Sequence, residues 1–137
     1  MTEKQLSLGD DEIVQTLNRV YQQFRDGQFG EAVPLLEHAL SVDFEYPGVA
    51  AALKCAGFWR ERQAAMAAMA RDEALGRFVF DNWKQFARFL AKTPDVSERC
   101  VFSIRSHVFG LALQTYLTLY ESSTRTDAMV LLSIGRC

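Results

Sequence analysis

The sequence predicts an all-helical fold, and three features lead to this prediction. Apolar residues recur at spacings of three and four along most of the 137-residue chain, which is the period of a helix face. The alternation of apolar and polar residues that is typical of strands is absent over any useful length. Only three prolines, Pro34, Pro47 and Pro94, interrupt these patterns.

Composition and charge restrict the class of protein. Hydrophobic residues make up 49% of the chain and charged residues 23%, which suits one ordinary domain with a real core. The formal net charge of -2 argues against nucleic acid as a partner. The N-terminus is polar and acidic, unlike a signal peptide, and no segment has the apolar length that crosses a bilayer. The odd number of cysteines favours a reducing compartment, so we expect a cytoplasmic protein without membrane insertion.

The first helix is expected to follow a flexible segment at residues 1–10. Asp10 and Asp11 precede an apolar stripe, and either side chain can cap a helix and complement its dipole. Gly27 is expected to end this helix, because glycine adopts the left-handed conformation at little cost. The stripe that faces inward consists of Ile13, Leu17, Val20, Tyr21 and Phe24.

A second helix is expected to begin near Gly30, which places Pro34 in its first turn, where amides have no partner within the helix. This helix is expected to end at residues 42–43. The connection to the first helix is so short that the two helices must form an antiparallel hairpin. Small Ala32 and Ala39 let the helices approach closely, while Phe29 and Leu36 fill the wider gaps. The inward face is predicted to comprise Ala32, Leu35, Leu36, Ala39 and Leu40.

Residues 27–43 also resemble a known repeat. The run "GQFGEA", followed by Leu36, Ala39, Leu40 and Asp43, is similar to the second helix of a tetratricopeptide repeat. That unit is a helix pair of about 34 residues. The apolar stripe between residues 17 and 24 resembles its first helix.

The rest of the chain matches this pattern less closely. Residues 48–93 predict two helices longer than the family norm, with a break between Arg71 and Gly76. Residues 96–121 predict another pair, with a first helix capped by Ser97, a turn near His107 and a second helix from Phe109. A final helix is expected to start at residue 126 or 127.

The resemblance implies an all-α, right-handed superhelix of stacked antiparallel hairpins, with about six or seven helices. It would form a single domain over residues 11–137, truncated at its C-terminal end from a longer array.

Few residues indicate catalysis. His38 and His107 lie far apart without metal-ligand spacing and are interpreted as an exposed helix residue and a turn residue. Cys55 and Cys100 adjoin packing positions and are expected to be buried thiols. Neither a phosphate-binding loop nor a dinucleotide-binding glycine motif is present. We therefore expect neither an enzyme nor a bound cofactor or metal.

The resemblance implies a non-catalytic scaffold that binds a peptide or helix of a protein partner on a concave surface lined by the first helices of the pairs. Some members of the family hold the terminal carboxylate of a peptide with lysine, arginine and asparagine; here the candidates are Asn18, Lys54 and Arg136, and the full set is not visible. The expected partner-binding residues are Asn18, Gln22, Arg25, Lys54, Phe58, Glu61, Arg62, Arg105 and Arg136.

Two other functions stay open at this stage. The aromatic and alanine-rich middle helices would also suit a homodimer interface, which makes self-association the main alternative. A helical enzyme domain would require a cluster of polar residues in a pocket, and the sequence offers no such grouping.

Overall fold

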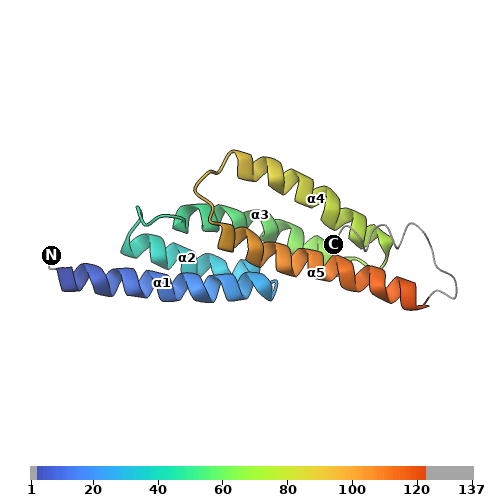
Figure 1. Ribbon diagram of the computed structural model, residues 1–137, viewed down its shortest axis with the longest axis horizontal. Coiled ribbons are helices and arrows are strands. Elements are labelled where there is room, and N and C mark those ends of the chain that lie inside the picture. The colour runs from blue at the N-terminus through green and yellow to red at the C-terminus, as the bar shows by residue number, and fades with distance from the viewer. Residues whose placement is uncertain (1–2, 123–137) are drawn as a thin grey trace.

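The computed structural model describes residues 3–122, and this part of the chain consists of helices without strands. The all-helical prediction is therefore confirmed. Figure 1 shows the five helices as an elongated arrangement in which α4 lies along one edge. They are α1 (Glu3–Arg25), α2 (Phe29–Val42), α3 (Val49–Ala68), α4 (Glu73–Ala91) and α5 (Glu98–Ser122).

Helix α1 begins earlier than expected. It starts at Glu3, so Asp10 and Asp11 lie on its exposed side within the helix and the prediction that they cap it is wrong. A glycine in a helix interior costs only about 1 kcal/mol, which explains why Gly9 does not stop the helix. The predicted end is confirmed, since Gly27 has a φ of 77° and the amide of Gln28 donates to the carbonyl of Gln23 over 2.8 Å.

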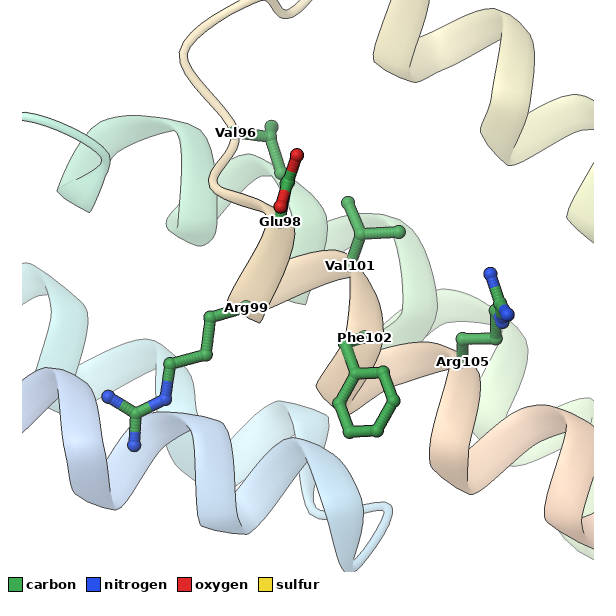
Figure 2. Close-up of a pocket in the computed structure, with 6 residues that line it drawn as sticks. All are labelled: Val96, Glu98, Arg99, Val101, Phe102 and Arg105. Atoms are coloured by element: carbon green, nitrogen blue, oxygen red, sulfur yellow. The ribbon is translucent and has the colours of Figure 1, made fainter.

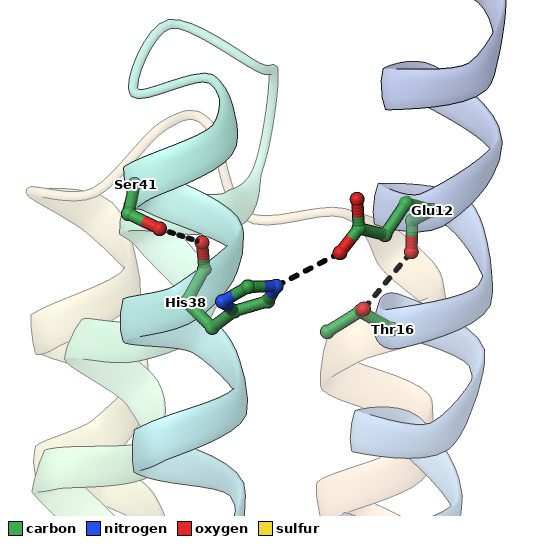
Figure 3. A network of polar contacts seen from close by, with 4 residues as sticks. All are labelled: Glu12, Thr16, His38 and Ser41. Carbon is green, nitrogen blue, oxygen red and sulfur yellow. Dashed lines mark hydrogen bonds and ion pairs between the residues drawn. The ribbon is translucent and has the colours of Figure 1, made fainter.

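Helix α2 runs back along α1 and buries the predicted small residues. Ala32 and Leu36 are fully buried and Ala39 nearly so. Pro34 is the sixth residue of the helix, in the second turn rather than the first, so the helix lacks one internal amide donor there. On the outside of this hairpin, Nε2 of the exposed His38 donates to Oε1 of Glu12 over 2.8 Å (Figure 3).

Helices α3 and α4 are separated by a break at residues 69–72, slightly before the expected position. Asp72 caps α4, because its Oδ1 accepts a hydrogen bond from the amide of Ala74 over 2.9 Å. Between the two helices lies an aromatic cluster in which Trp59 and Phe86 are fully buried, with ring centroids 5.4 Å apart. The cluster consists of Phe58, Trp59, Trp83, Phe86 and Phe89.

Helix α5 is continuous where the sequence predicted two helices. The expected turn near His107 is absent, and His107 is a half-buried helix residue. One unbroken stripe explains the continuity, since a buried residue occurs at every fourth position. These residues are Cys100, Ile104, Val108, Ala112 and Tyr116.

The predicted start of α5 is confirmed, because Oγ of Ser97 accepts a hydrogen bond from the amide of Cys100 over 3.1 Å. The number of helices in the described part is five rather than six or seven. The helix expected from residue 126 or 127 lies outside the described residues.

The contacts between helices determine which side of α5 stays exposed. Helix α1 packs against α2 and α5, α2 packs against α3, and α4 packs chiefly against α5. At the α4–α5 contact, Gly76 lies against the ring of Tyr116, where a side chain on residue 76 would collide with it. Within residues 3–122, no helix combines the length and apolar character required to cross a membrane.

Candidate functional site

A surface groove of about 570 Å³ lies along the N-terminal part of α5. One of the side chains that line it is Phe102, which is 54% exposed. Figure 2 shows this ring between the side chains of Arg99 and Arg105. The residues that line the groove are Val96, Glu98, Arg99, Val101, Phe102 and Arg105.

The periodicity of α5 produces this surface. While Cys100 and Ile104 face the core, Arg99, Phe102 and Arg105 follow each other at intervals of three residues and stay exposed. Helix packing then fixes the depth of the groove, since α1 approaches this end of α5. The hydroxyl of Tyr21 lies 3.2 Å from Oγ of Ser97, and burial raises the pKa of Tyr21, so its phenol stays protonated.

Helix α1 contributes polar side chains to the same surface. The guanidinium of Arg99 donates to Oδ1 of Asn18 over 2.6 Å and lies 5.1 Å from the centroid of the Tyr21 ring. The guanidinium of Arg25 lies 5.5 Å from the centroid of the Phe102 ring. The structure thus places Asn18 beside Arg99 and Arg25 beside Phe102, while Arg105, another of the predicted binding residues, lines the groove one turn further along α5.

Gln22 also lies on this stretch of α1, one turn after Asn18 and before Arg25. Its side-chain amide donates to Oδ1 of Asp26 over 3.3 Å. Gln22 therefore orients a carboxylate at the end of α1, and its side chain is exposed as the sequence suggested.

The arginines in and beside the groove form no ion pair among the described residues. In the part of the chain that the structure describes, the ion pairs join His38 to Glu12, Arg62 to Glu61 and Arg77 to Glu73. Arg99 and Arg105 line the groove and Arg25 lies beside Phe102, and none of them takes part in these pairs. The one carboxylate that lines the groove is Glu98, which Figure 2 shows directed toward Val96. This arrangement suits an anionic group bound next to an apolar surface.

The predicted binding residues on α3 lie elsewhere. Lys54 and Glu61 are exposed, whereas Phe58 and Arg62 are half-buried and contact α4. Arg62 donates to Oδ1 of Asn82 over 2.8 Å and to Oε1 of Gln85 over 3.2 Å. The remaining candidate, Arg136, lies outside the described residues.

Arg62 is a link between helices in this structure. Its guanidinium stacks 3.5 Å from the centroid of the Phe58 ring and also donates to the Phe58 carbonyl over 2.8 Å. Burial is the main cause that lowers its pKa, while Glu61 acts in the opposite direction. Most of its hydrogen-bonding capacity is therefore already used between α3 and α4.

Two residues central to the groove, Arg99 and Phe102, were not among those predicted from sequence. A signal for them exists in the spacing of Arg99, Phe102 and Arg105, which puts a phenylalanine into the polar stripe of an amphipathic helix. All three residues precede the turn that was expected near His107, so this signal was already present within the first of the two predicted helices.

A smaller cavity of about 190 Å³ adjoins the turn between α1 and α2 and includes His107. The His107 ring donates to the backbone carbonyl of Arg25 and meets the Phe29 ring edge-on at 5.7 Å. Burial is the largest cause of its lowered pKa. The side-chain amide of Gln63 donates to the Gly27 carbonyl beside it.

The thiols of Cys55 and Cys100 are buried as predicted. A hydrogen bond to the Cys55 thiol, followed by burial, raises the pKa of Cys100 above its usual range, which suppresses the nucleophilic thiolate. Across residues whose positions are described, His, Cys, Asp and Glu side chains form no group of three that would hold a metal ion.

No protein-family model matches the sequence, and neither a curated protein nor a solved structure matches it. Function is therefore inferred from the groove and from the residues near Phe102.

Proposed function

We propose that this protein is a non-catalytic interaction scaffold that binds a peptide or helix of a protein partner in the groove along the N-terminal part of α5. The observation that carries the proposal is Phe102, which is 54% exposed in a groove flanked by three arginines. Aromatic and arginine side chains dominate the binding energy of protein interfaces, and an apolar anchor inside a polar rim is their usual arrangement.

The chemistry of the groove supports binding rather than catalysis. Arginine side chains stay protonated at physiological pH and do not exchange protons with a substrate. The remaining charged group that lines the groove is the carboxylate of Glu98. The Tyr21 phenol beneath the groove stays protonated because burial raises its pKa.

The hairpin of α1 and α2 supports the relation to tetratricopeptide repeats that we propose for this chain. Ala32 and Ala39 are both buried in close helix contacts, as that resemblance implies. The proposed superhelix has less support, because α1 also packs against α5. A linear stack of hairpins keeps its first and third pairs apart. The repeat-like unit of this proposal is therefore the first hairpin, with the groove at its contact with α5.

Selection from an unbiased peptide display library tests the proposed function with the full chain as bait. Selected peptides should bind Phe102→Ser about tenfold more weakly than the unmodified protein, because they lose their aromatic contact. Phe44→Ser is the matched control, since Phe44 is 75% exposed and lies in the turn between α2 and α3. Absence of enriched peptides, or peptides equally sensitive to both variants, would contradict the proposal.

Self-association through the middle helices remains the alternative, but the aromatic residues that suggested it are used inside the molecule. Trp59 and Phe86 are fully buried between α3 and α4. Sedimentation velocity over a range of protein concentrations measures this directly. A dimer that dissociates when exposed Ala64 or Ala68 is replaced by glutamate would favour self-association over partner binding.

A further inference from the structure

We infer that the segment bound in the groove along α5 is acidic, with an apolar side chain on Phe102 and side-chain carboxylates that reach Arg99 and Arg105 in the groove and Arg25 beside it. This inference rests on the proposed function, because it states the chemistry of the partner at the same site. It concerns carboxylates within a segment and does not involve the free C-terminus of a peptide.

Charge is the first argument. The guanidinium of Arg25 lies 5.5 Å from the centroid of the exposed Phe102 ring, and Arg99 and Arg105 line the same groove, although the chain as a whole has a net charge of -2. Among the residues described, none of the three lies within 4.0 Å of a carboxylate oxygen that would form an ion pair. A complementary acidic segment would neutralise this local charge and would be guided to the groove by it.

Unused hydrogen-bond donors are the second argument. A guanidinium has five N–H donors in a planar fork that matches a carboxylate. The hydrogen bond from Arg99 to Asn18 fixes that side chain through one nitrogen and leaves its other nitrogens for a ligand. Arg99 is thereby held in place before any partner binds, which reduces the entropy cost of binding.

Spacing defines the segment further. Arg99 and Arg105 are six residues apart on α5, a separation of roughly 9 Å along the helix axis, with Phe102 midway. Successive side chains of an extended segment point to opposite faces. An apolar residue with acidic residues two positions before it and two positions after it therefore presents all three side chains to α5, and Arg25 lies beside the Phe102 ring from α1.

Single-stranded nucleic acid is the competing class of ligand, because bases stack on aromatic rings while phosphates bind arginine. The groove favours a peptide because it presents a single exposed ring, whereas strand-binding surfaces stack successive bases on several aromatic side chains.

Fluorescence polarisation with the full chain tests the inference. The probes are three labelled peptides with amidated C-termini that share one scaffold, in which leucine is flanked on both sides by glutamates, by glutamines or by lysines. A labelled oligouridine is the fourth probe. The protein variants are Arg25→Gln and Arg105→Gln, with Arg88→Gln on α4 as a matched control that removes the same charge outside the groove. Circular dichroism checks that each variant keeps its helices.

We expect the glutamate peptide to bind at least about tenfold more tightly than the glutamine peptide and the lysine peptide not to bind. Arg25→Gln and Arg105→Gln should each weaken the glutamate peptide about two- to fivefold, and Arg88→Gln should leave it unchanged. Rising salt should weaken this binding, because the charges are exposed.

Other outcomes overturn the inference in distinguishable ways. Equal affinity for the glutamate and glutamine peptides would remove the acidic requirement, while peptides from the display library that depend on Phe102 would still support the proposed function. Tighter binding of oligouridine than of the glutamate peptide would replace the partner with nucleic acid. Loss of affinity in Arg88→Gln equal to that in Arg105→Gln would show non-specific attraction. Failure of all probes together with an unenriched library would overturn both proposals.

Discussion

Two arginine–asparagine pairs on different sides of this molecule have the same components and different consequences. Arg62 donates to Asn82 over 2.8 Å and stacks on Phe58, while Arg99 donates to Asn18 over 2.6 Å and lies over Tyr21. The first pair joins α3 to α4, and the second joins α5 to α1. Each therefore connects helices that belong to different parts of the chain.

Exposure separates the two pairs. Asn82 is only 8% exposed, and Arg62 spends further donors on Gln85 and on a backbone carbonyl. Arg99 is exposed at the edge of a groove and makes one such hydrogen bond. An arginine that lies over an aromatic ring therefore indicates a binding surface only where water or a partner can still reach its remaining N–H donors.

The largest expected contrast is between two phenylalanines on these two sides. Phe86→Ala should reduce the free energy of unfolding by about 3–5 kcal/mol, because it leaves a cavity in the aromatic cluster around a fully buried ring. Phe102→Ala should change stability by about 0.5 kcal/mol or less, since the ring is exposed. Urea unfolding followed by circular dichroism measures both. Comparable losses for the two variants would mean that Phe102 belongs to the core and that the groove is misassigned.

The next contrast concerns the arginines themselves. Arg62→Ala should cost about 1–3 kcal/mol of unfolding free energy, because the nearly buried amide oxygen of Asn82 loses its donor. Arg99→Ala should cost less than about 1 kcal/mol, since water replaces it at Asn18. The same unfolding experiment decides the matter, and a larger loss for Arg99→Ala than for Arg62→Ala would reverse the roles assigned here.

The smallest expected effect is a dependence of stability on pH that arises from His107. Burial lowers the pKa of His107 in the folded protein, so the unfolded chain binds a proton more readily than the folded one. Its contribution to stability is therefore complete above the unfolded pKa of about 6.5 and declines as pH falls from there toward the lower folded value. Melting temperatures between pH 7.5 and pH 5 should fall less steeply for His107→Gln than for the unmodified protein.

A matched control for this experiment is Ser106→Ala, which changes an exposed neighbour on the same helix without removing an ionisable group. It should retain the pH dependence of the unmodified protein. An equally steep decline in His107→Gln would assign the effect to another group.

The first hairpin shows how far local patterns extend. Spacings of three and four placed Ala32, Leu36 and Ala39 correctly in the interior, and Gly27 marked the end of α1 because its positive φ suits glycine. The cap of α5 at Ser97 was predictable for the same reason, since its hydroxyl bonds to an amide three residues away. Such interactions lie within one or two helical turns and depend little on the rest of the molecule.

The predicted helix boundaries were wrong where tertiary packing outweighed a weak local preference against helix. Gly9 and Gly110 each reduce helix propensity, yet both lie within continuous helices. In α5 the buried stripe from Cys100 to Tyr116 packs against other helices on both sides of Gly110, and this burial outweighs the cost of one glycine. The predicted division of α5 near His107 was wrong for this reason.

In the groove, too, some features follow from local sequence and others from helix packing. The residues of α1 proposed from sequence, Asn18 and Arg25, reach it because they share an outward stripe of one helix. They contact Arg99 and Phe102 only because α1 packs against α5. Asn18 and Arg99, for example, are 81 positions apart in the chain.

Helix content, the inward faces and the helix ends at Gly27 and Ser97 follow from the sequence of this protein, because periodicity and capping act between near neighbours. The exposure of Phe102, the internal use of Arg62 and the contacts of Arg25 with Phe102 and of Arg99 with Asn18 depend on tertiary structure. Whether a side chain is buried or accessible is determined by the helices that pack over it, and these come from distant parts of the chain.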